Sequence, residues 1–270
     1  MTGLRSLSCA CGVLLAALGT VARAQPASAR PLCADRPGKA TPPCILDVGR
    51  LQVEAGLFEA SRERRNGARD DLDAYGGLEL RAGLTRWSEF ELSWTPWTVE
   101  RAQDGGTVQR RAGMGDVTAG FRAALTDPDR SGFALSVRPF LSAPTATHHM
   151  GAGGWQGGVS LPASRAAGSW TLGATPELDI ARNAGGGGTH LAGALAVAAS
   201  RGLGPLTLGA ELWAAVDDDP LGRSTQASFD LTSAWTPAAD PELQLDAGVN
   251  LGLNGQTPGL DVYLGLTRRF

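Results

Sequence analysis

The last eleven residues of the chain, 260–270, read LDVYLGLTRRF and alternate between apolar and polar side chains. Because successive side chains of a strand point to opposite faces, the apolar residues share one face of such a strand. They are Leu260, Val262, Leu264 and Leu266, and the other face carries Asp261, Tyr263, Gly265 and Thr267. One face suits lipid and the other suits water. A strand of this kind that ends on an aromatic residue, here Phe270, is typical of the closing strand and assembly signal of a bacterial outer-membrane β-barrel.

The other end of the chain has the features of an export signal. Arg5 precedes an apolar run at residues 7–19, and Ala22-Arg23-Ala24 has small residues at the positions that a signal peptidase reads. We therefore expect residues 1–24 to be a signal peptide that is cleaved after Ala24. Cys9 and Cys11 lack the surrounding residues of a lipoprotein box, so we expect the mature chain to be neither acylated nor anchored by a helix.

Cleavage would remove two arginines and no acid, which takes the formal charge from −3 to −5. This mild acidity argues against nucleic acid as a partner. Of the four cysteines only Cys33 and Cys44 would remain, within residues 25–44, a segment that we expect to lie in the periplasm. Export to an oxidising compartment favours a disulfide between them. A metal site there would need more ligands than Asp35 supplies.

The hydropathy of the chain is that of a soluble protein, with a mean hydropathy of −0.08 and 43% hydrophobic residues. No stretch after residue 24 approaches the ~20 apolar residues of a spanning helix. A barrel hides its hydrophobicity in this way, because every second residue of its strands faces the lumen. Residues 243–254 alternate without exception and residues 206–217 alternate similarly, over lengths that match a tilted membrane strand better than the shorter strands of a soluble β-sandwich.

Turn signals divide the rest of the chain into twelve expected strands. They are at 46–60, 71–85, 87–100, 111–126, 132–145, 153–163, 169–182, 188–201, 205–217, 224–237, 242–254 and 258–270. An even number lets an antiparallel up-and-down barrel close with both termini in the periplasm, and closure removes the edges that lipid cannot satisfy. The sequence therefore predicts an all-β transmembrane barrel at residues 45–270.

The same alternation predicts which side chains face the lumen. The acids are Glu54, Glu79, Glu89, Glu91, Asp116, Glu177, Asp179, Glu211, Asp230, Asp246 and Asp261, and the cations are Arg81, Arg122, Arg138 and Arg269. Trp213 is also expected inside. Two interpretations stay open: solvated or paired charges that fill a narrow wall, or a negative lumen that favours cations.

The sequence offers little chemistry. The histidines are His148, His149 and His190, and no Ser/His/Asn or Asp/His arrangement matches them in strand register. The acidic run 217–219 lacks the spacing and the closing glutamate of a calcium loop. The glycines at 185–188 are not followed by a helix on which a phosphate could sit. We therefore expect no enzyme, no cofactor and no metal.

Several motifs resemble one known family. They are Gly113-Met114-Gly115-Asp116-Val117 with Gly120-Phe121-Arg122, then Gln244-Leu245-Asp246-Ala247-Gly248, the C-terminal Gly265 to Phe270, and the early residues 32–37 and 43–44. With them the chain resembles, over residues 32–270, the outer-membrane transporter barrels named for the meta-pathway of phenol degradation. The resemblance implies an outer-membrane barrel for uptake or passage of small organic molecules, with aromatic catabolites as the nominal class. Arg268 departs from the usual assembly signal, since an apolar or aromatic residue is common at its position.

The expected function is passive passage of small, aromatic or hydrophobic solutes through the outer membrane of a Gram-negative bacterium, without long loops or a plug domain. The expected partners are outer-membrane lipid, the barrel-assembly machinery and a small-molecule solute. One alternative is a barrel that conducts nothing and has a structural or interaction role. Less favoured are a membrane-embedded hydrolase and a secreted soluble sandwich.

Overall fold

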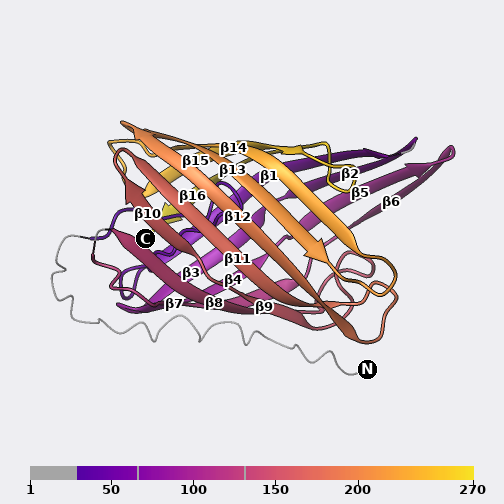
Figure 1. The fold of residues 1–270 in the computed structure, drawn as a ribbon, viewed down its shortest axis with the longest axis horizontal. Helices are drawn as coiled ribbons and strands as arrows, with labels where there is room; N and C mark the ends of the chain where they lie inside the picture. Colours follow the sequence, from indigo (N-terminus) through magenta and orange to yellow (C-terminus); the bar gives the residue numbers. More distant parts are fainter. Residues whose placement is uncertain (1–28, 66, 131) are drawn as a thin grey trace, which may run out of the picture.

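The chain folds into a closed antiparallel β-barrel of twelve strands (Figure 1). The structure is a computed structural model that describes residues 29–65, 67–130 and 132–270, so the expected signal peptide and its cleavage site lie outside the described residues. The last strand pairs with the first, from Gln52 with Arg269 to Arg62 with Leu260, which closes the barrel. The prediction of a twelve-stranded, up-and-down barrel is confirmed. The described part of the chain has no helix that is both long and apolar enough to cross a membrane.

Twelve membrane-crossing spans are built from sixteen strand segments, because four spans are interrupted. The segments are β1 (Leu51–Arg65), β2 (Ala68–Tyr75), β3 (Gly77–Thr85), β4 (Ser88–Trp94), β5 (Trp97–Asp104), β6 (Thr107–Gly113), β7 (Val117–Ala124), β8 (Phe133–Ala143), β9 (Gln156–Ser160), β10 (Ala163–Ala167), β11 (Trp170–Arg182), β12 (Thr189–Leu203), β13 (Leu206–Asp217), β14 (Ser224–Trp235), β15 (Leu243–Gly252) and β16 (Leu260–Arg269). The pairs β2/β3, β4/β5, β6/β7 and β9/β10 each form one span.

Three of the four interruptions have a local cause. Pro96 and Pro162 have no N–H for the ladder, so the strands that contain them break there. Gly76 takes a positive φ of 69°, which bends the chain between β2 and β3. Two other prolines, Pro139 and Pro176, lie within β8 and β11 and continue in register there.

The burial of side chains is reversed compared with that of a soluble protein. Among the described residues, the fully buried large side chains are mostly charged or polar, such as Arg81, Arg122 and Glu89. Many of the large apolar side chains point outward instead, including Leu178, Leu212 and Leu264. This arrangement suits a wall with lipid outside and polar groups inside.

The two ends of the barrel differ. β1 begins and β16 ends at one end, here called the terminal end, and the connections there are mostly short turns. At the opposite end, here called the loop end, the β2, β5 and β6 segments project beyond the rest of the wall (Figure 1). Within the described residues β6 pairs only with β5. The far half of this hairpin therefore rises beyond the closed part of the barrel.

One boundary differs from the prediction in an informative way. The first strand begins at Leu51 and not near Leu46. Ile45 and Leu46 are each only 2% exposed, although they precede the wall. They are apolar because they pack inside the barrel, not because they face lipid.

Candidate functional site: a plug in the lumen

Residues 30–47, here called the plug, lie within the barrel and contact its wall on all sides. Their hydrogen bonds reach β1, β3, β4, β7, β11, β13, β14, β15 and β16. Figure 1 shows this start of the described chain, in indigo, within the outline of the barrel near its terminal end. We expected residues 25–44 to form a separate periplasmic segment and the barrel to have no plug. The described part of that segment instead lies in the lumen as a plug. Its charged side chains pair there with wall residues of opposite charge.

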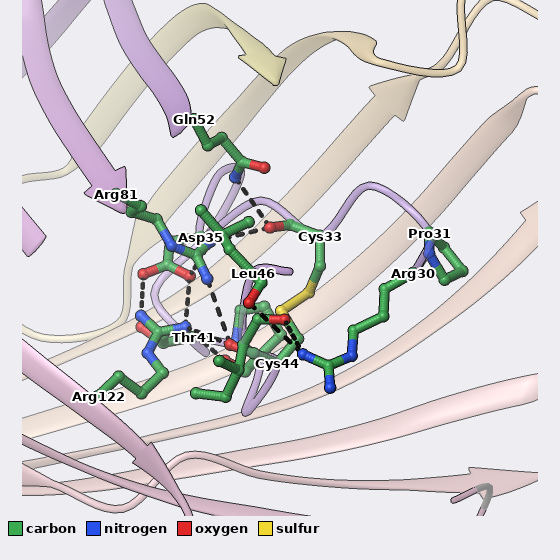
Figure 2. Close-up of a disulfide and its surroundings, with 12 residues drawn as sticks. Arg30, Pro31, Cys33, Asp35, Thr41, Cys44, Leu46, Gln52, Arg81 and Arg122 are labelled. Atoms are coloured by element: carbon green, nitrogen blue, oxygen red, sulfur yellow. Dashed lines mark hydrogen bonds and ion pairs between the residues drawn. A yellow bond between two sulfur atoms is a disulfide. The ribbon is translucent and has the colours of Figure 1, made fainter. Parts of the chain in front are cut away.

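A disulfide between Cys33 and Cys44 gives the plug its shape (Figure 2). The two Cα atoms lie 6.4 Å apart and eleven positions apart in the sequence. This confirms the predicted disulfide. The backbone oxygens of both cysteines accept hydrogen bonds from Arg81 of the wall, at 2.9 Å from Cys33 and 3.3 Å from Cys44. The disulfide therefore presents two carbonyl groups to a single arginine.

Asp35 joins the plug to two arginines of the wall (Figure 2). Its Oδ1 accepts from Arg122 Nη1 at 3.0 Å and from Arg81 Nη1 at 3.2 Å, and its Oδ2 accepts from Arg122 Nη2. Burial alone would raise the pKa of Asp35, but Arg122 and Arg81 hold this pKa well below its ordinary value of 3.8. Asp35 is therefore an anion inside the lumen.

The wall around Asp35 is a dense charge network. Arg81 also pairs with Glu89 at 2.6 Å and with Glu54 at 3.1 Å, and all three side chains are fully buried. Arg122 pairs with Glu91 at 2.7 Å. Arg138 pairs with Glu91 and, at 3.3 Å, with Glu79. The arginines of this side are thus shared among wall acids and the plug, which removes the cost of burying each charge alone.

The opposite wall, on β13 to β16, binds two cations of the plug, Arg36 and Lys39. Arg36 donates to Asp246 Oδ1 from Nη2 at 3.0 Å, and its guanidinium carbon lies 5.7 Å from the centroid of the Tyr263 ring. Lys39 Nζ donates to Asp230 Oδ2 at 2.8 Å and lies 5.1 Å from the centroid of the Trp213 ring. Asp35 therefore faces arginines on one wall, and Arg36 and Lys39 face acids and aromatic rings on the other.

Two glycines make the close approach of plug and wall possible. Gly38 has a φ of +96°, and a Cβ there would lie 2.4 Å from the carboxylate of Glu211, which accepts the Lys39 backbone N–H at 2.7 Å. Gly83 of β3 passes so near to Asp47 that a Cβ would lie 2.1 Å from its carbonyl oxygen. At the same place Gly49 N–H donates to the Gly83 carbonyl at 2.9 Å. The plug thus turns into β1 over a short, hydrogen-bonded hinge.

Open space remains beyond the plug. One cavity of about 380 Å³ is lined by Arg36, Glu54, Glu59 and Asp116, among others. A second cavity of about 350 Å³ lies against Glu177, Asp179 and Trp213. Within the described part of the chain, neither Glu177 nor Asp179 has a cationic side chain within 4 Å, so this part of the lumen is acidic.

Most of the expected lumen residues belong to one of two networks: the charge network around Asp35, or the acids and aromatic rings that bind Arg36 and Lys39. Asp116 lies in the interruption between β6 and β7, where its carboxylate accepts the backbone N–H groups of Ala146 and Ala152 at 2.9 Å. Arg269 lies at the terminal end and donates to the Pro31 carbonyl at 3.2 Å. Arg268, at the outward position, pairs with Asp240 of the neighbouring turn. Asp261 contacts Asn250 at 3.5 Å. Five expected lumen residues belong to neither network: Asp116, Glu177, Asp179, Asp261 and Arg269.

The groups considered for chemistry are separate from one another. The rings of His148 and His149 meet edge to face, with their centroids 3.7 Å apart, in the connection after β8. His190 Nε2 lies 2.8 Å from Asp217, and Asp219 accepts backbone N–H groups of Ala184 and Leu221. The carboxylates of Asp35, Glu79 and Glu91 approach one another, but each of them is paired with a wall arginine, Arg122 or Arg138.

Several solved structures share this fold. An outer membrane channel from Pseudomonas putida F1 is 17% identical, with a TM-score of 0.68 over 87% of this chain and 99% of that one. The β domain of the Bordetella autotransporter BrkA is 14% identical, with a TM-score of 0.55 over 83% of this chain and all of that domain. The translocator domain of the autotransporter NalP from Neisseria meningitidis is 14% identical, with a TM-score of 0.51 over 83% of this chain and 89% of that domain. At these identities the likeness establishes the fold alone, which is that of outer-membrane β-barrels.

The sequence itself was also compared with protein families and with curated proteins. No curated protein matches it. A family match runs over residues 34–270, which includes most of the plug and the whole barrel. The resemblance noted from the sequence motifs is thereby confirmed: the chain belongs to the family described as "Putative MetA-pathway of phenol degradation".

Proposed function

We propose that the protein is an outer-membrane channel for the passive passage of small solutes, and that the plug closes it at the terminal end. The observation that carries this proposal is a closed barrel with apolar side chains outside and a polar lumen occupied by a segment of the same chain. Such a lumen can pass solutes when its occupant moves, and it needs no catalytic group. The similar channel from Pseudomonas putida F1 supports the same function.

The proposal includes the route by which the barrel reaches its membrane. Residues 1–24 act as a signal peptide that is cleaved after Ala24, and the assembly machinery recognises the strand that ends at Phe270. The loop end then faces outside and the terminal end faces the periplasm. The family's name suggests aromatic solutes, but the open part of the lumen is lined by acids, which favours cations or neutral molecules over phenolate-like anions.

Reconstitution into planar bilayers tests the channel. We expect conductance steps, and under a salt gradient we expect a reversal potential that shows a preference for cations. The double variant Glu177→Gln/Asp179→Asn should move the cation-to-anion permeability ratio toward one, since these acids have no cationic partner among the described residues. The matched variant Asp70→Asn/Asp104→Asn removes two charges from the projecting β2 and β5 segments and should leave the ratio unchanged.

A barrel with a structural role is the second candidate. The observation that favours it is the fully buried pairing of Arg81 with Glu54 and Glu89, which fills part of the lumen beside the plug with paired side chains. Protein that is folded, as judged by heat-modifiable migration, but gives no conductance steps in any variant would contradict the channel and favour this role.

A further inference from the structure

Two cations of the plug, Arg36 and Lys39, occupy the same kind of site on the wall. Each lies over an aromatic ring and pairs with a carboxylate that is buried in the wall: Arg36 with Tyr263 and Asp246, and Lys39 with Trp213 and Asp230. A ring face beside a buried carboxylate is a favourable environment for an organic cation, because the ring quadrupole and the ion pair act together. The plug therefore reveals what this wall binds.

We propose that the Lys39 site, formed by Glu211, Trp213, Ser228 and Asp230, is a recognition site for small primary ammonium ions, and that Lys39 is its internal occupant in the closed barrel. The proposal extends the channel function and rests on it in one respect: the ligand is a transported solute only if the barrel is a channel. A solute with an ammonium group on a short carbon chain has the same shape and charge as the Lys39 side chain, so it competes for the same atoms.

The hydrogen-bonding groups fit a primary ammonium. Lys39 Nζ donates to Asp230 Oδ2 at 2.8 Å and to Ser228 Oγ at 3.1 Å, which leaves one of its three donors for another acceptor. Asp230 is fully buried, and its Oδ1 has no hydrogen-bond partner in the described structure. The site thus offers an acceptor that Lys39, held by its own backbone, does not use.

The negative charge of the site also exceeds the single positive charge that Lys39 supplies. Glu211 lies directly across the ladder from Asp230, and its carboxylate is used by the Lys39 backbone N–H, which carries no charge. Two carboxylates therefore face one ammonium. A free ammonium ion, unlike the tethered one, can choose the position in which it reaches both.

A solute can approach the site from the loop end. Trp213 also lines the cavity of about 350 Å³ that contains the acids Glu177 and Asp179. The rest of that lining includes the small residues Ala192, Gly193 and Ala194, which leave room for a carbon chain. The cavity and the Lys39 site thus share one ring, so a cation that is attracted into the cavity lies next to the site.

Chemical rescue of the full chain in detergent tests the proposal. Lys39→Ala removes the atoms of n-propylammonium, so calorimetric titration with that ion should give binding at least about tenfold tighter than in the wild-type chain. Asp230→Asn in the Lys39→Ala background should abolish this binding. Asp261→Asn in the same background removes another lumen acid away from the site and should retain the binding.

Three results would overturn the site: no binding by Lys39→Ala, equal binding after Asp230→Asn, or equal binding of 1-propanol or propionate. Heat-modifiable migration checks that each variant is folded, and Trp213→Leu in the Lys39→Ala background replaces Asp230→Asn if the latter does not fold. Binding without conductance in any variant would contradict the channel and leave the site standing. Conductance without binding would contradict the site alone.

Discussion

Asp35 is the carboxylate that connects the plug to the arginine side of the wall. Replacing it with asparagine removes the charge that Arg81 and Arg122 share, while both arginines keep their wall glutamates. We expect Asp35→Asn to lower the free energy of unfolding by about 2–4 kcal/mol. This is toward the lower end of the cost of breaking a buried ion pair, because both arginines keep other partners. We also expect the variant to have a higher open probability in planar bilayers. The temperature at which the folded band disappears on unheated gels measures the first effect. Asp218→Asn, in an exposed pair with Arg223, should change neither quantity.

The pH dependence of the Asp35 contribution follows from its lowered pKa. A carboxyl group whose pKa falls on folding stabilises the folded state above its ordinary pKa, 3.8, and loses this effect as the pH falls through the lower, folded value. The stability difference between wild type and Asp35→Asn should therefore be constant from pH 8 to about pH 5 and shrink only in stronger acid. Thermal unfolding of both proteins at several pH values checks this. A difference that already declines between pH 7 and pH 5 would refute the assignment.

At the residue scale, alternation alone predicted that acids such as Glu211, Asp230 and Asp246 share the polar face of their strands. It did not find their partners. Arg36 and Lys39 lie in a segment without periodicity, so nothing in the sequence assigns their side chains a direction or a register. The pairing of Arg36 with Asp246, more than two hundred residues away, depends on closure of the whole barrel.

At the scale of elements, the disulfide determines how the plug meets the wall. The Cys33–Cys44 loop holds two carbonyl groups against Arg81, so opening it lets the plug reach more conformations. Closing a loop of about this length contributes roughly 3 kcal/mol. We expect a membrane-permeant reductant to increase conductance and current noise. The variant Cys33→Ser/Cys44→Ser should show this higher conductance from the start and should not respond to the reductant.

The strands of the second half were predicted almost to the residue, whereas the first strand was misplaced by several positions. In β13 and β15 one face meets lipid and the other lines the lumen, so the alternation can be followed along most of each strand. Ile45 and Leu46 extend the apolar pattern before β1, but they pack within the plug. A pattern of apolar residues shows that a side chain avoids water and does not distinguish lipid from a plug interior.

At the scale of the whole molecule, the outward face should behave as a lipid contact. Leu212 lies near the middle of β13 and is 52% exposed on the outside of the wall. Leu212→Arg should destabilise the barrel by about 2–4 kcal/mol in lipid vesicles, because an arginine at the bilayer midplane is unfavourable. Unfolding by denaturant in vesicles measures this. Leu221→Arg, in the connection between β13 and β14, should change the free energy of unfolding little. An equal loss of stability in both variants would argue against a membrane-embedded wall.

Closure of the barrel was predictable because an even number of long two-faced strands has one solution that leaves no edge in lipid. The plug was not predictable from the sequence. It is short, irregular and rich in charge, and such a pattern is typical of a solvated segment before the first strand. Its role emerges only when Asp35, Arg36 and Lys39 are seen against the walls that complement them.

The hinge at Gly49 has a further consequence, for the rate at which the plug returns. Because the plug is joined to β1 by only a few residues, it stays close to its site after it detaches, and its rebinding is intramolecular. A short tether of this kind corresponds to an effective concentration in the millimolar range. A solute that binds the wall as well as Lys39 does must therefore accumulate to about that concentration in the lumen before it occupies the site half of the time. The channel would respond to abundant solutes and ignore traces.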